Sequence, residues 1–446
     1  MTNLRNTTAI LAARTVAKVS KLLGKKASSA PGVIAMKISP GLVKTLAAQV
    51  KKEIILVCGT NGKTTTNNLI YTLLKEDGNK VVCNNVGANM LSGIACSFIL
   101  EASLSGKLDA DYAVLECDEA FLRHIVKHIT PDKILLTNLF RDQMDRYGEI
   151  EMTSAFINEA IEMVPETTLI LNADDPICVG LGHGRKAIYY GVSEDTGIKS
   201  KETTDGRFCS VCGEELTYDY RHYSQLGSFR CEKCGFQRPN PNYSATRVDI
   251  SDGIKFVLSY KGMQYKLKVN YRGFYNIYNI LASFAAYESA GGNIENAEKT
   301  FNAYKPQAGR MESFTIGGKT AVLNLAKNPA GFNQSIAAVC SDTKKKDIVF
   351  AVNDAVSDGT DVSWLWDVDF EALKDQGIET VYVSGTRKYD LAVRLKHAGF
   401  ENIKPCEINA DTIKEILSGD GETCYMIVNY TMLFGTQEKL KGLEDK

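Results

Sequence analysis

The chain has 446 residues, of which 44% are hydrophobic and 24% charged, and its formal net charge is −1 at pH 7. This composition excludes a disordered chain, and the charge excludes a whole-protein attraction to nucleic acid. The length predicts two or three domains of about 100–200 residues each. No apolar run reaches the ~18 residues of a membrane span, and no signal-peptide core is present. Eight scattered cysteines and two C-x-x-C pairs are typical of the cytoplasm, where we expect this protein.

Residues 1–50 are predicted to form a basic helical segment. Residues 1–52 contain ten Lys or Arg and no Asp or Glu. This segment fits a peripheral contact with the inner face of an anionic membrane, packing on the domain with a solvated basic face, or a transit peptide. At about 100° per residue the predicted apolar face holds Ala12, Val16, Val19 and Leu23, and the opposite face holds Arg14, Lys18, Lys21 and Lys25.

A phosphate-binding loop is predicted where the sequence GTNGKTTT follows the apolar run 54–58 and precedes the helical pattern 67–75. Small residues let backbone N–H groups approach phosphate, and the helix N-terminus adds partial positive charge. Lys63 is expected to reach the β- and γ-phosphates, and Thr64 or Thr65 to reach Mg²⁺. Val57 replaces the first glycine of the usual pattern, so an ordinary glycine turn is the alternative. The predicted nucleotide ligands in this loop are Gly59, Thr60, Asn61, Gly62, Lys63, Thr64 and Thr65.

Strand-like and helical patterns then alternate, which predicts a doubly wound parallel sheet in a central α/β domain at 51–305. Functional residues should lie at the carboxyl ends of its strands. Glu116 ends one apolar run and is expected to hold Mg²⁺ beside the phosphate loop. Polar stretches at 138–148 and 172–176 follow later strands and fit either a ligand contact or an Asx-rich turn. The strand-like runs lie at 54–58, 81–83, 112–117, 133–138, 168–172 and 187–192.

A zinc ribbon is predicted to interrupt this pattern at about 197–245. Two C-x-x-C pairs lie 18 residues apart, and four thiolates fit tetrahedral Zn²⁺. Four cysteine ligands leave no open position, so the zinc should be structural; free or redox-active cysteines are the alternative. His222 lies between the pairs and is expected to be a surface or packing residue. The predicted zinc ligands are Cys209, Cys212, Cys231 and Cys234.

A strand-like sequence pattern resumes at 246–269, and a helical pattern runs from Gly273 to Tyr287. The region around Lys305 and Gly309 is predicted to be a linker. A further alternation of strands and helices predicts a C-terminal α/β domain at 306–446, which is long enough to hold its own core. Its predicted strands lie at 320–325, 347–352, 380–384 and 424–428.

These motifs, in this order, resemble the Mur ligase family, which uses ATP to join amines to carboxylates through acyl phosphates. The resemblance implies a P-loop central domain in which Lys63 and Arg310 stabilise the transferring phosphoryl group, and Thr64 or Thr65 with Glu116 holds Mg²⁺. It also implies nucleotide-side roles for Asn172, Asp175 and Asn276. The matching segments are residues 59–65, Glu116, 138–148, 172–176, Gly273-x-x-Asn276-x-x-Asn279, Gly309-Arg310-Met311-Glu312 and Asn328-Pro329.

Departures from the family pattern are concentrated at one metal site and at the amine site. Gln143 stands where the family usually has a metal-binding His, and no Lys between 133 and 186 can become the usual carbamylated lysine. Tyr275 and Lys327 replace two further histidines of family motifs. The sequence therefore leaves a second metal open and predicts altered handling of the amine.

The zinc ribbon and residues 325–331 and 358–364 resemble one branch of this family. That branch amidates the D-glutamate α-carboxylate of the lipid II stem peptide, which gives D-isoglutamine. It implies lipid II as substrate and a partner glutaminase, GatD, that supplies ammonia within a heterodimer or larger complex. The resemblance also implies a synthase aspartate that completes the partner's Cys–His pair. We predict Asp361 for this role, with Asp354 and Asp358 as nearby alternatives and a solvated acidic loop as another.

A separate ammonia source agrees with the residues present. A glutaminase needs an activated Cys, usually with a His, whereas this chain has five histidines and no G-x-C-x-G turn. The predicted catalytic residues are thus Lys63, Glu116 and Asp361. Two other functions stay open: a Mur-type ligase that adds an amino acid, and a zinc-ribbon ATPase that binds nucleic acid or protein through basic and aromatic residues. Of these we favour amidation, with no nucleic acid as partner.

Overall fold

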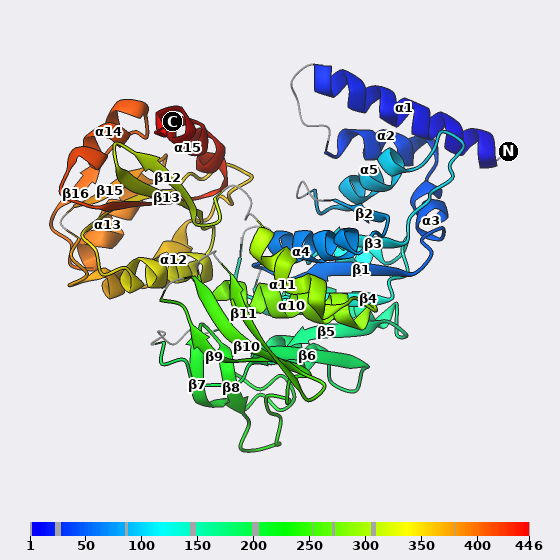
Figure 1. Cartoon of the computed structure of the whole chain (residues 1–446), viewed down its shortest axis with the longest axis horizontal. Helices are drawn as coiled ribbons and strands as arrows, with labels where there is room; N and C mark the ends of the chain where they lie inside the picture. The colour runs from blue at the N-terminus through cyan, green and yellow to red at the C-terminus, as the bar shows by residue number, and fades with distance from the viewer. Residues whose placement is uncertain are drawn as a thin grey trace.

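The chain is built on two large β-sheets, each covered by helices. Figure 1 shows them side by side, with the N-terminal helices at one end. This computed structural model describes residues 2–22, 28–84, 88–142, 149–198, 205–251, 253–269, 273–304, 309–378 and 380–445. Among them, every helix is too short or too polar to cross a bilayer.

The first sheet has nine strands in the order β11-β10-β9-β6-β5-β4-β1-β3-β2. In this order the strands from β9 to β2 pair in parallel, as predicted, and β10 and β11 are added antiparallel beyond β9, with β11 at the edge. Each predicted strand up to residue 192 is present. The strands are β1 (Glu53–Cys58), β2 (Val81–Cys83), β3 (Tyr112–Glu116), β4 (Lys133–Leu136), β5 (Thr168–Asn172), β6 (Ala187–Val192), β9 (Tyr243–Asp249), β10 (Ile254–Tyr260) and β11 (Met263–Val269).

Helices cover both faces of this sheet, which explains why its strands are apolar on both sides. Successive β1 residues face opposite ways: Ile55 and Val57 join one core, and Leu56 and Cys58 join the other. The first core is covered by α4 (Lys63–Glu76), α10 (Tyr275–Ser289) and α11 (Ile294–Ala303). The second is covered by α5 (Leu91–Glu101), α6 (Leu122–Ile125), α8 (Ile150–Glu162) and α9 (Pro176–Leu181).

The N-terminal segment forms three helices that pack on the central domain through α5: α1 (Thr2–Leu22), α2 (Ala30–Ile38) and α3 (Leu42–Ala47). The buried face of α1 contains Ala9, Ile10 and Ala13. The small alanines allow α2 and α5 to approach, and this packing decides which face turns inward.

The faces of α1 therefore differ from the prediction. Val19, on the predicted apolar face, is 49% exposed, so that face is not the one that packs on the domain. Arg14, assigned to a solvated basic face, donates hydrogen bonds to the carbonyl oxygens of Ile99 and Leu100 at the end of α5. Leu23 and Lys25 lie outside the described residues.

The cysteine-rich insertion lies between β6 and β9 and contains the hairpin of β7 (Thr217–Tyr223) and β8 (Leu226–Arg230). Phe229 and Leu216 pack with the cysteines in a small core against Val179 of α9. The insertion was predicted at about 197–245, and β9, which pairs with β6 of the main sheet, begins at Tyr243.

The C-terminal sheet has the order β12-β13-β17-β14-β15-β16, and only β12 is antiparallel. All four strands predicted in this region are present. The predicted domain boundary at 305/306 falls in residues 305–308, outside the described residues. The strands are β12 (Glu312–Ile316), β13 (Lys319–Leu325), β14 (Lys346–Ala351), β15 (Val381–Ser384), β16 (Ile403–Pro405) and β17 (Thr423–Val428). The helices are α12 (Pro329–Ser341), η1 (Ser363–Asp367), η2 (Phe370–Leu373), α13 (Lys388–His397), α14 (Ala410–Ser418) and α15 (Tyr430–Leu443).

Candidate functional site

The predicted phosphate loop links β1 to α4 and needs glycine at two positions. Gly59 and Gly62 have φ values of 118° and 87°, a region that side chains rarely adopt. A Cβ on Gly59 would lie 2.4 Å from Thr137 Oγ1, and one on Gly62 would lie 2.2 Å from Asn279 Oδ1. The loop is therefore held close to both the end of β4 and helix α10.

Hydrogen bonds from the segment after β4 fix the loop. The N–H groups of Thr60 and Asn61 donate to the backbone oxygen (2.8 Å) and the Oδ1 atom (2.9 Å) of Asn138. Asn138 Nδ2 donates to the Asn61 carbonyl at 3.0 Å, and the Phe140 N–H donates to Thr60 Oγ1 at 3.0 Å. The first turn of α4 keeps N–H groups that no helical carbonyl can satisfy, and these suit a phosphate.

Lys63 is buried at the start of α4 and forms an ion pair that the sequence analysis did not predict. Its Nζ atom lies 3.1 Å from Glu119 Oε2 and also contacts the carbonyl oxygens of Gly59 and Thr60. Burial alone lowers the pKa of Lys63, but the carboxylates of Glu119 and Glu116 outweigh it and hold that pKa above its usual value. The lysine is thus a fixed cation at the phosphate loop.

Glu116 ends β3, the strand beside β1, and its carboxylate is buried. Asn89 Nδ2 lies 3.4 Å from its Oε1 atom, whereas Oε2 has no hydrogen-bond partner among the described residues. A buried carboxylate oxygen without a donor is costly, and a bound cation removes that cost. Glu116, with the hydroxyl of Thr64 or Thr65, fits the oxygen ligands that Mg²⁺ prefers.

Asn172 and Asp175 are fully buried and support the loop from the next strand. Asn172 Nδ2 donates to the Thr137 carbonyl at 3.1 Å. Asp175 caps α9, accepts from the Leu139 N–H at 2.8 Å, and burial raises its pKa to about 6. Both side chains therefore hold the segment that clamps the phosphate loop, and their predicted contact with nucleotide stays a prediction.

Asn276 is buried at the start of α10 and accepts from Asn279 Nδ2 at 2.9 Å. Asn279 Oδ1 lies 3.4 Å from Thr66 Oγ1 of α4, which joins the two helices beside the loop. Arg310 is half-buried. Burial raises the pKa of Tyr275, and the positive charge of the Arg310 guanidinium partly offsets that rise. Arg310 thus lies near the start of α10, where positive charge is available to a phosphate.

Two residues of the C-terminal domain reach this site. Asn328 caps α12, and its Oδ1 atom lies 3.4 Å from Asn61 Nδ2 in the phosphate loop. Lys327 Nζ lies 2.6 Å from Asp142 Oδ2, while the buried Asp142 Oδ1 has no hydrogen-bond partner among the described residues. Lys327 also lowers the pKa of Glu119, whose net rise comes from burial. Gln143 and the rest of its stretch to 148 lie outside the described residues.

The four predicted zinc ligands form one cluster. Their Sγ atoms all lie within 4.8 Å of one another, with Cys209 to Cys234 at 3.6 Å and Cys212 to Cys231 at 3.5 Å. This donor set and spacing fit tetrahedral Zn²⁺.

The insertion also contacts the segment that follows β4 and clamps the phosphate loop. Gln225, at the hairpin turn, donates to the Leu139 carbonyl at 2.5 Å, and the Arg141 N–H donates to Asp205 at 3.1 Å. Arg238 forms a buried ion pair with Asp174 at 2.6 Å. His222 is fully buried, so of the two predicted roles it has the packing one.

Composition alone favoured a nucleic-acid surface on this insertion, but the structure pairs its cations. Arg207, Arg230 and Lys233 form ion pairs with acidic residues of the insertion itself. Two of its aromatic rings, Tyr223 and Phe229, are buried in cores. These cations and rings are therefore engaged within the protein, and they do not form the free basic and aromatic surface that would favour nucleic-acid binding.

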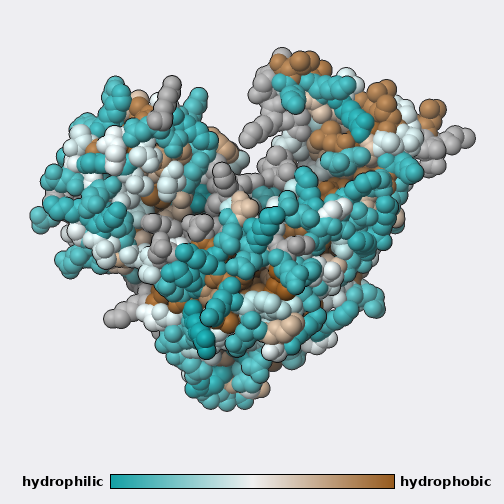
Figure 2. All heavy atoms as spheres, in the orientation of Figure 1, coloured by the Kyte–Doolittle hydropathy of each residue, from teal (hydrophilic) through white to brown (hydrophobic). Residues whose placement is uncertain are grey.

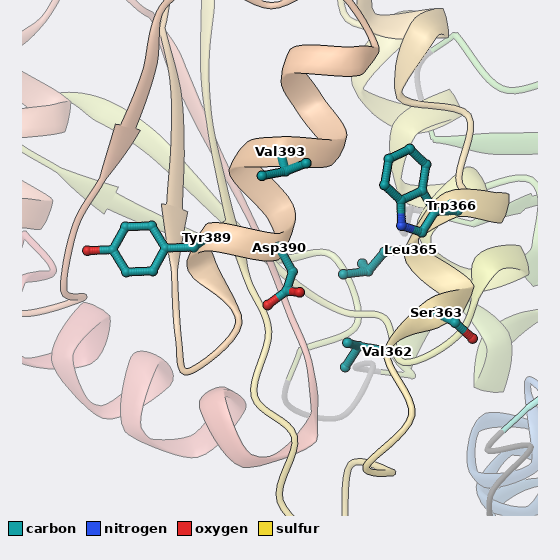
Figure 3. A pocket seen from close by; sticks show the side chains of 7 residues that line it. All are labelled: Val362, Ser363, Leu365, Trp366, Tyr389, Asp390 and Val393. Atoms are coloured by element: carbon teal, nitrogen blue, oxygen red, sulfur yellow. The ribbon is translucent and has the colours of Figure 1, made fainter.

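A surface pocket of about 320 Å³ lies between η1 and α13, and its lining includes Val362, the residue that follows Asp361 in the chain (Figure 3). Asp361 Oδ1 accepts from the Ser363 N–H at 2.8 Å, and Oδ2 has no recorded partner among the described residues. Of the alternatives, Asp358 is buried and accepts twice from Thr431. Asp354 is paired with Arg387 at 2.9 Å. The pocket is lined by Val362, Ser363, Leu365, Trp366, Tyr389, Asp390 and Val393.

Comparisons with known proteins agree with this arrangement. The Mur ligase middle domain matches residues 57–287, and the MurT ligase C-terminal domain matches residues 325–433. The lipid II isoglutaminyl synthase (glutamine-hydrolyzing) subunit MurT of Staphylococcus aureus is 37% identical over 444 residues, which covers 98% of each chain. The MurT subunit of Streptococcus pneumoniae is 35% identical and covers 98% of this chain and 97% of that relative.

Solved structures share the fold. A pseudomurein peptide ligase type C from Methanothermus fervidus superposes with a TM-score of 0.72 at 24% identity, covering 90% of this chain and 80% of that one. MurF from Acinetobacter baumannii superposes with a TM-score of 0.66 at 14% identity, covering 93% and 80%.

Proposed function

The chain belongs to the Mur ligase family, among the MurT subunits of lipid II isoglutaminyl synthase, and we propose how its residues perform the reaction of that branch. The chain is an ATP-dependent carbon–nitrogen ligase. It amidates the D-glutamate α-carboxylate of the lipid II stem peptide through an acyl phosphate, and the product is D-isoglutamine. We assign phosphate binding to the 59–65 loop and charge stabilisation to Lys63 and Arg310.

One observation carries this assignment: a buried lysine at the start of α4, just after the loop that follows β1, and a buried carboxylate at the end of the neighbouring strand β3. Lys63 supplies a fixed cation, and Glu116 Oε2 lacks a partner. Mg²⁺, held by Glu116 and Thr64 or Thr65, would neutralise phosphate charge when bound. Asn172 and Asp175 act by holding the clamp segment, because both are fully buried. Asn276 holds the start of α10 beside the loop.

During phosphoryl transfer the positive groups of the chain face increasing negative charge on the phosphate oxygens. Lys63 exchanges its contact with Glu119 for phosphate, and the first-turn N–H groups of α4 donate to the same ligand. The carboxylate of the stem peptide attacks the γ-phosphorus, and ADP leaves. Neutral ammonia then attacks the acyl carbon and expels phosphate, so positioning matters more than strong acid–base assistance.

We propose that ammonia comes from a separate glutaminase subunit, GatD, which docks at the pocket between η1 and α13, close to Asp361 in the chain. Trp366 and Tyr389 are exposed there, and exposed aromatic residues are typical anchors of protein interfaces. The Asp361 carboxylate keeps an oxygen available, so it is able to orient a partner histidine and stabilise its cation. Asp358 and Asp354 already have internal partners. The complex is a heterodimer or a larger assembly.

We also propose a structural Zn²⁺ in the four-cysteine cluster, which keeps Gln225 against the catalytic segment. The enzyme is proposed to work in the cytoplasm, peripherally at the inner face of the membrane, because relatives are named for a lipid-linked substrate.

The experiment is amidation of purified lipid II by this chain, with ATP and either ammonium or glutamine plus co-expressed glutaminase. Mass spectrometry should detect amide formation that needs ATP in both cases and needs the partner only with glutamine. If lipid II were not amidated with either nitrogen source, and amino acids were added to it instead, the chain would be an amino-acid-adding ligase.

A further inference from the structure

Helix α1 is apolar on two opposite faces, although a surface helix needs only one. The inner face, with Ala9, Ile10 and Ala13, is fully buried against the domain. The outer face exposes Leu4 (76%), Leu11 (55%) and Leu22 (86%). At about 100° per residue these three leucines lie within ~20° of one another and on the side opposite the buried residues.

This outer face is part of a larger hydrophobic area. Val19 of α1 is also exposed, as are Leu100 at the end of α5 and Leu104 just after it. Figure 2 shows hydrophobic residues gathered at the upper right of the molecule, over α1 and the region below it. Exposed apolar residues gathered on one side of a molecule favour an interaction surface there.

The charge around the face indicates what covers it. Lys18 lies on the same side of α1 as Leu11 and Leu22, and Arg5 and Lys21 are exposed on its flanks. The first acidic residue of the chain is Glu53, so α1, α2 and α3 carry only positive charge. A second copy of this face would be repelled, whereas an anionic lipid surface would be attracted.

We infer that α1 lies flat on an anionic lipid surface, with Leu4, Leu11 and Leu22 in the acyl boundary and the flanking cations among the headgroups. A helix with a leucine face and flanking lysines binds membranes by this combination of apolar burial and electrostatic attraction. This inference concerns only α1, so it does not depend on the chemistry of the nucleotide site.

The test is co-sedimentation of the full-length protein with vesicles of phosphatidylcholine alone or with about one-third phosphatidylglycerol. We expect binding only to the anionic vesicles, weakening as salt is raised. Leu11→Ser with Leu22→Ser, or Lys18→Glu with Lys21→Glu, should lower the partition coefficient by about tenfold or more. The matched control is Met152→Ser with Met163→Ser, which removes two exposed apolar side chains from α8 and its C-terminal boundary and should leave binding unchanged.

Equal binding to both vesicle types, or equal binding by the α1 leucine variant, would overturn the inference. So would a change of oligomeric state in that variant, because the face would then be a protein contact. Thermal melting shows whether each variant is folded; loss of binding in folded lysine and leucine variants supports the inference. The α1 variants should still amidate a water-soluble acceptor. If the proposed function were wrong, the wild-type protein would bind vesicles but would not amidate that acceptor.

Discussion

Lys327 of the C-terminal domain places its Nζ atom 2.6 Å from Asp142 Oδ2 of the central domain. The ammonium thus neutralises a nearly buried carboxylate at the edge of the nucleotide site and also acts on Glu119. A family motif has His at the position of Lys327, and the usual carbamylated lysine has no candidate in this chain. Lys327 therefore places an ammonium group in the region where the sequence left a second metal open.

Replacing Lys327 with Met should slow amidation by about tenfold to a hundredfold, because Asp142 would then be a buried charge without a partner and the domains would lose a contact. Lys327→Arg should retain part of the activity, since it keeps the charge. The measurement is kcat with saturating ATP and ammonium. Lys414→Met, at an exposed position in the same domain, is the control, and a wild-type rate for Lys327→Met would refute the role.

Lys63→Ala should abolish ATP turnover. Because Lys63 is paired with Glu119, the variant also leaves a buried carboxylate unpaired and should melt at a lower temperature. Adding Glu119→Gln should restore stability without restoring ATP turnover. Lys75→Ala, exposed on the same helix, should change neither property. ATP turnover in the folded double variant would show that Lys63 does not bind phosphate.

Glu116→Gln should weaken Mg²⁺ binding and lower ATP turnover by orders of magnitude, because an amide lacks the charge of the carboxylate. It should also stabilise the metal-free protein, since an amide is less costly than an ion at a buried position without a donor. The measurement pairs the magnesium dependence of turnover with thermal melting in a chelator. Unchanged magnesium dependence would place the metal elsewhere.

Cys209→Ser should remove zinc and lower the melting temperature. Structural Zn²⁺ contributes on the order of 10–16 kcal/mol in zinc-finger peptides. Because Gln225 of the insertion holds Leu139, loss of zinc should also slow amidation. Elemental analysis should give close to one zinc per chain in the wild type. Cys340→Ser, outside the cluster, is the control; metal-free protein with an unchanged melting curve would contradict a structural zinc.

The pH dependence of stability should carry a signature of Asp175. Burial raises its pKa to about 6, against ~3.9 in the unfolded chain. Between these values the folded protein holds a proton that the unfolded chain releases, so this group makes the free energy of unfolding fall as pH rises from about 4 to 6. Asp175→Asn removes the effect, which amounts to about 3 kcal/mol. Urea denaturation should show the variant gaining on the wild type across that window; a constant difference would exclude the shift.

The sequence predicted the central strands well because buried parallel strands are short apolar runs bounded by polar residues. The strand-to-helix pattern around Lys63 and the strand end at Glu116 could also be read from the sequence, while the roles of the two residues stay predictions. The antiparallel pair β10 and β11 was predicted only as a strand-like region, because the periodicity of apolar residues does not indicate the direction in which strands pair.

Relationships set by tertiary packing were beyond sequence reasoning. The Lys63–Glu119 pair depends on the path of the chain after β3, and the Lys327–Asp142 pair depends on how two domains meet. Which face of α1 turns inward was also beyond sequence reasoning: several of its faces contain apolar residues, and the positions of α2 and α5 select the one with Ala9, Ile10 and Ala13.

The most direct test of the central claim uses Asp361→Asn in the complex with the glutaminase, assayed with glutamine and then with saturating ammonium. Because Asp361 is far in sequence from the phosphate loop and keeps an oxygen available, the variant should lose glutamine-dependent amidation by about a hundredfold or more and keep ammonium-dependent amidation. Asp375→Asn, an exposed residue with φ of 61° that Asn tolerates, should behave as wild type. Equal losses with both nitrogen sources, or no loss with glutamine, would contradict a ligase fed by a partner through Asp361.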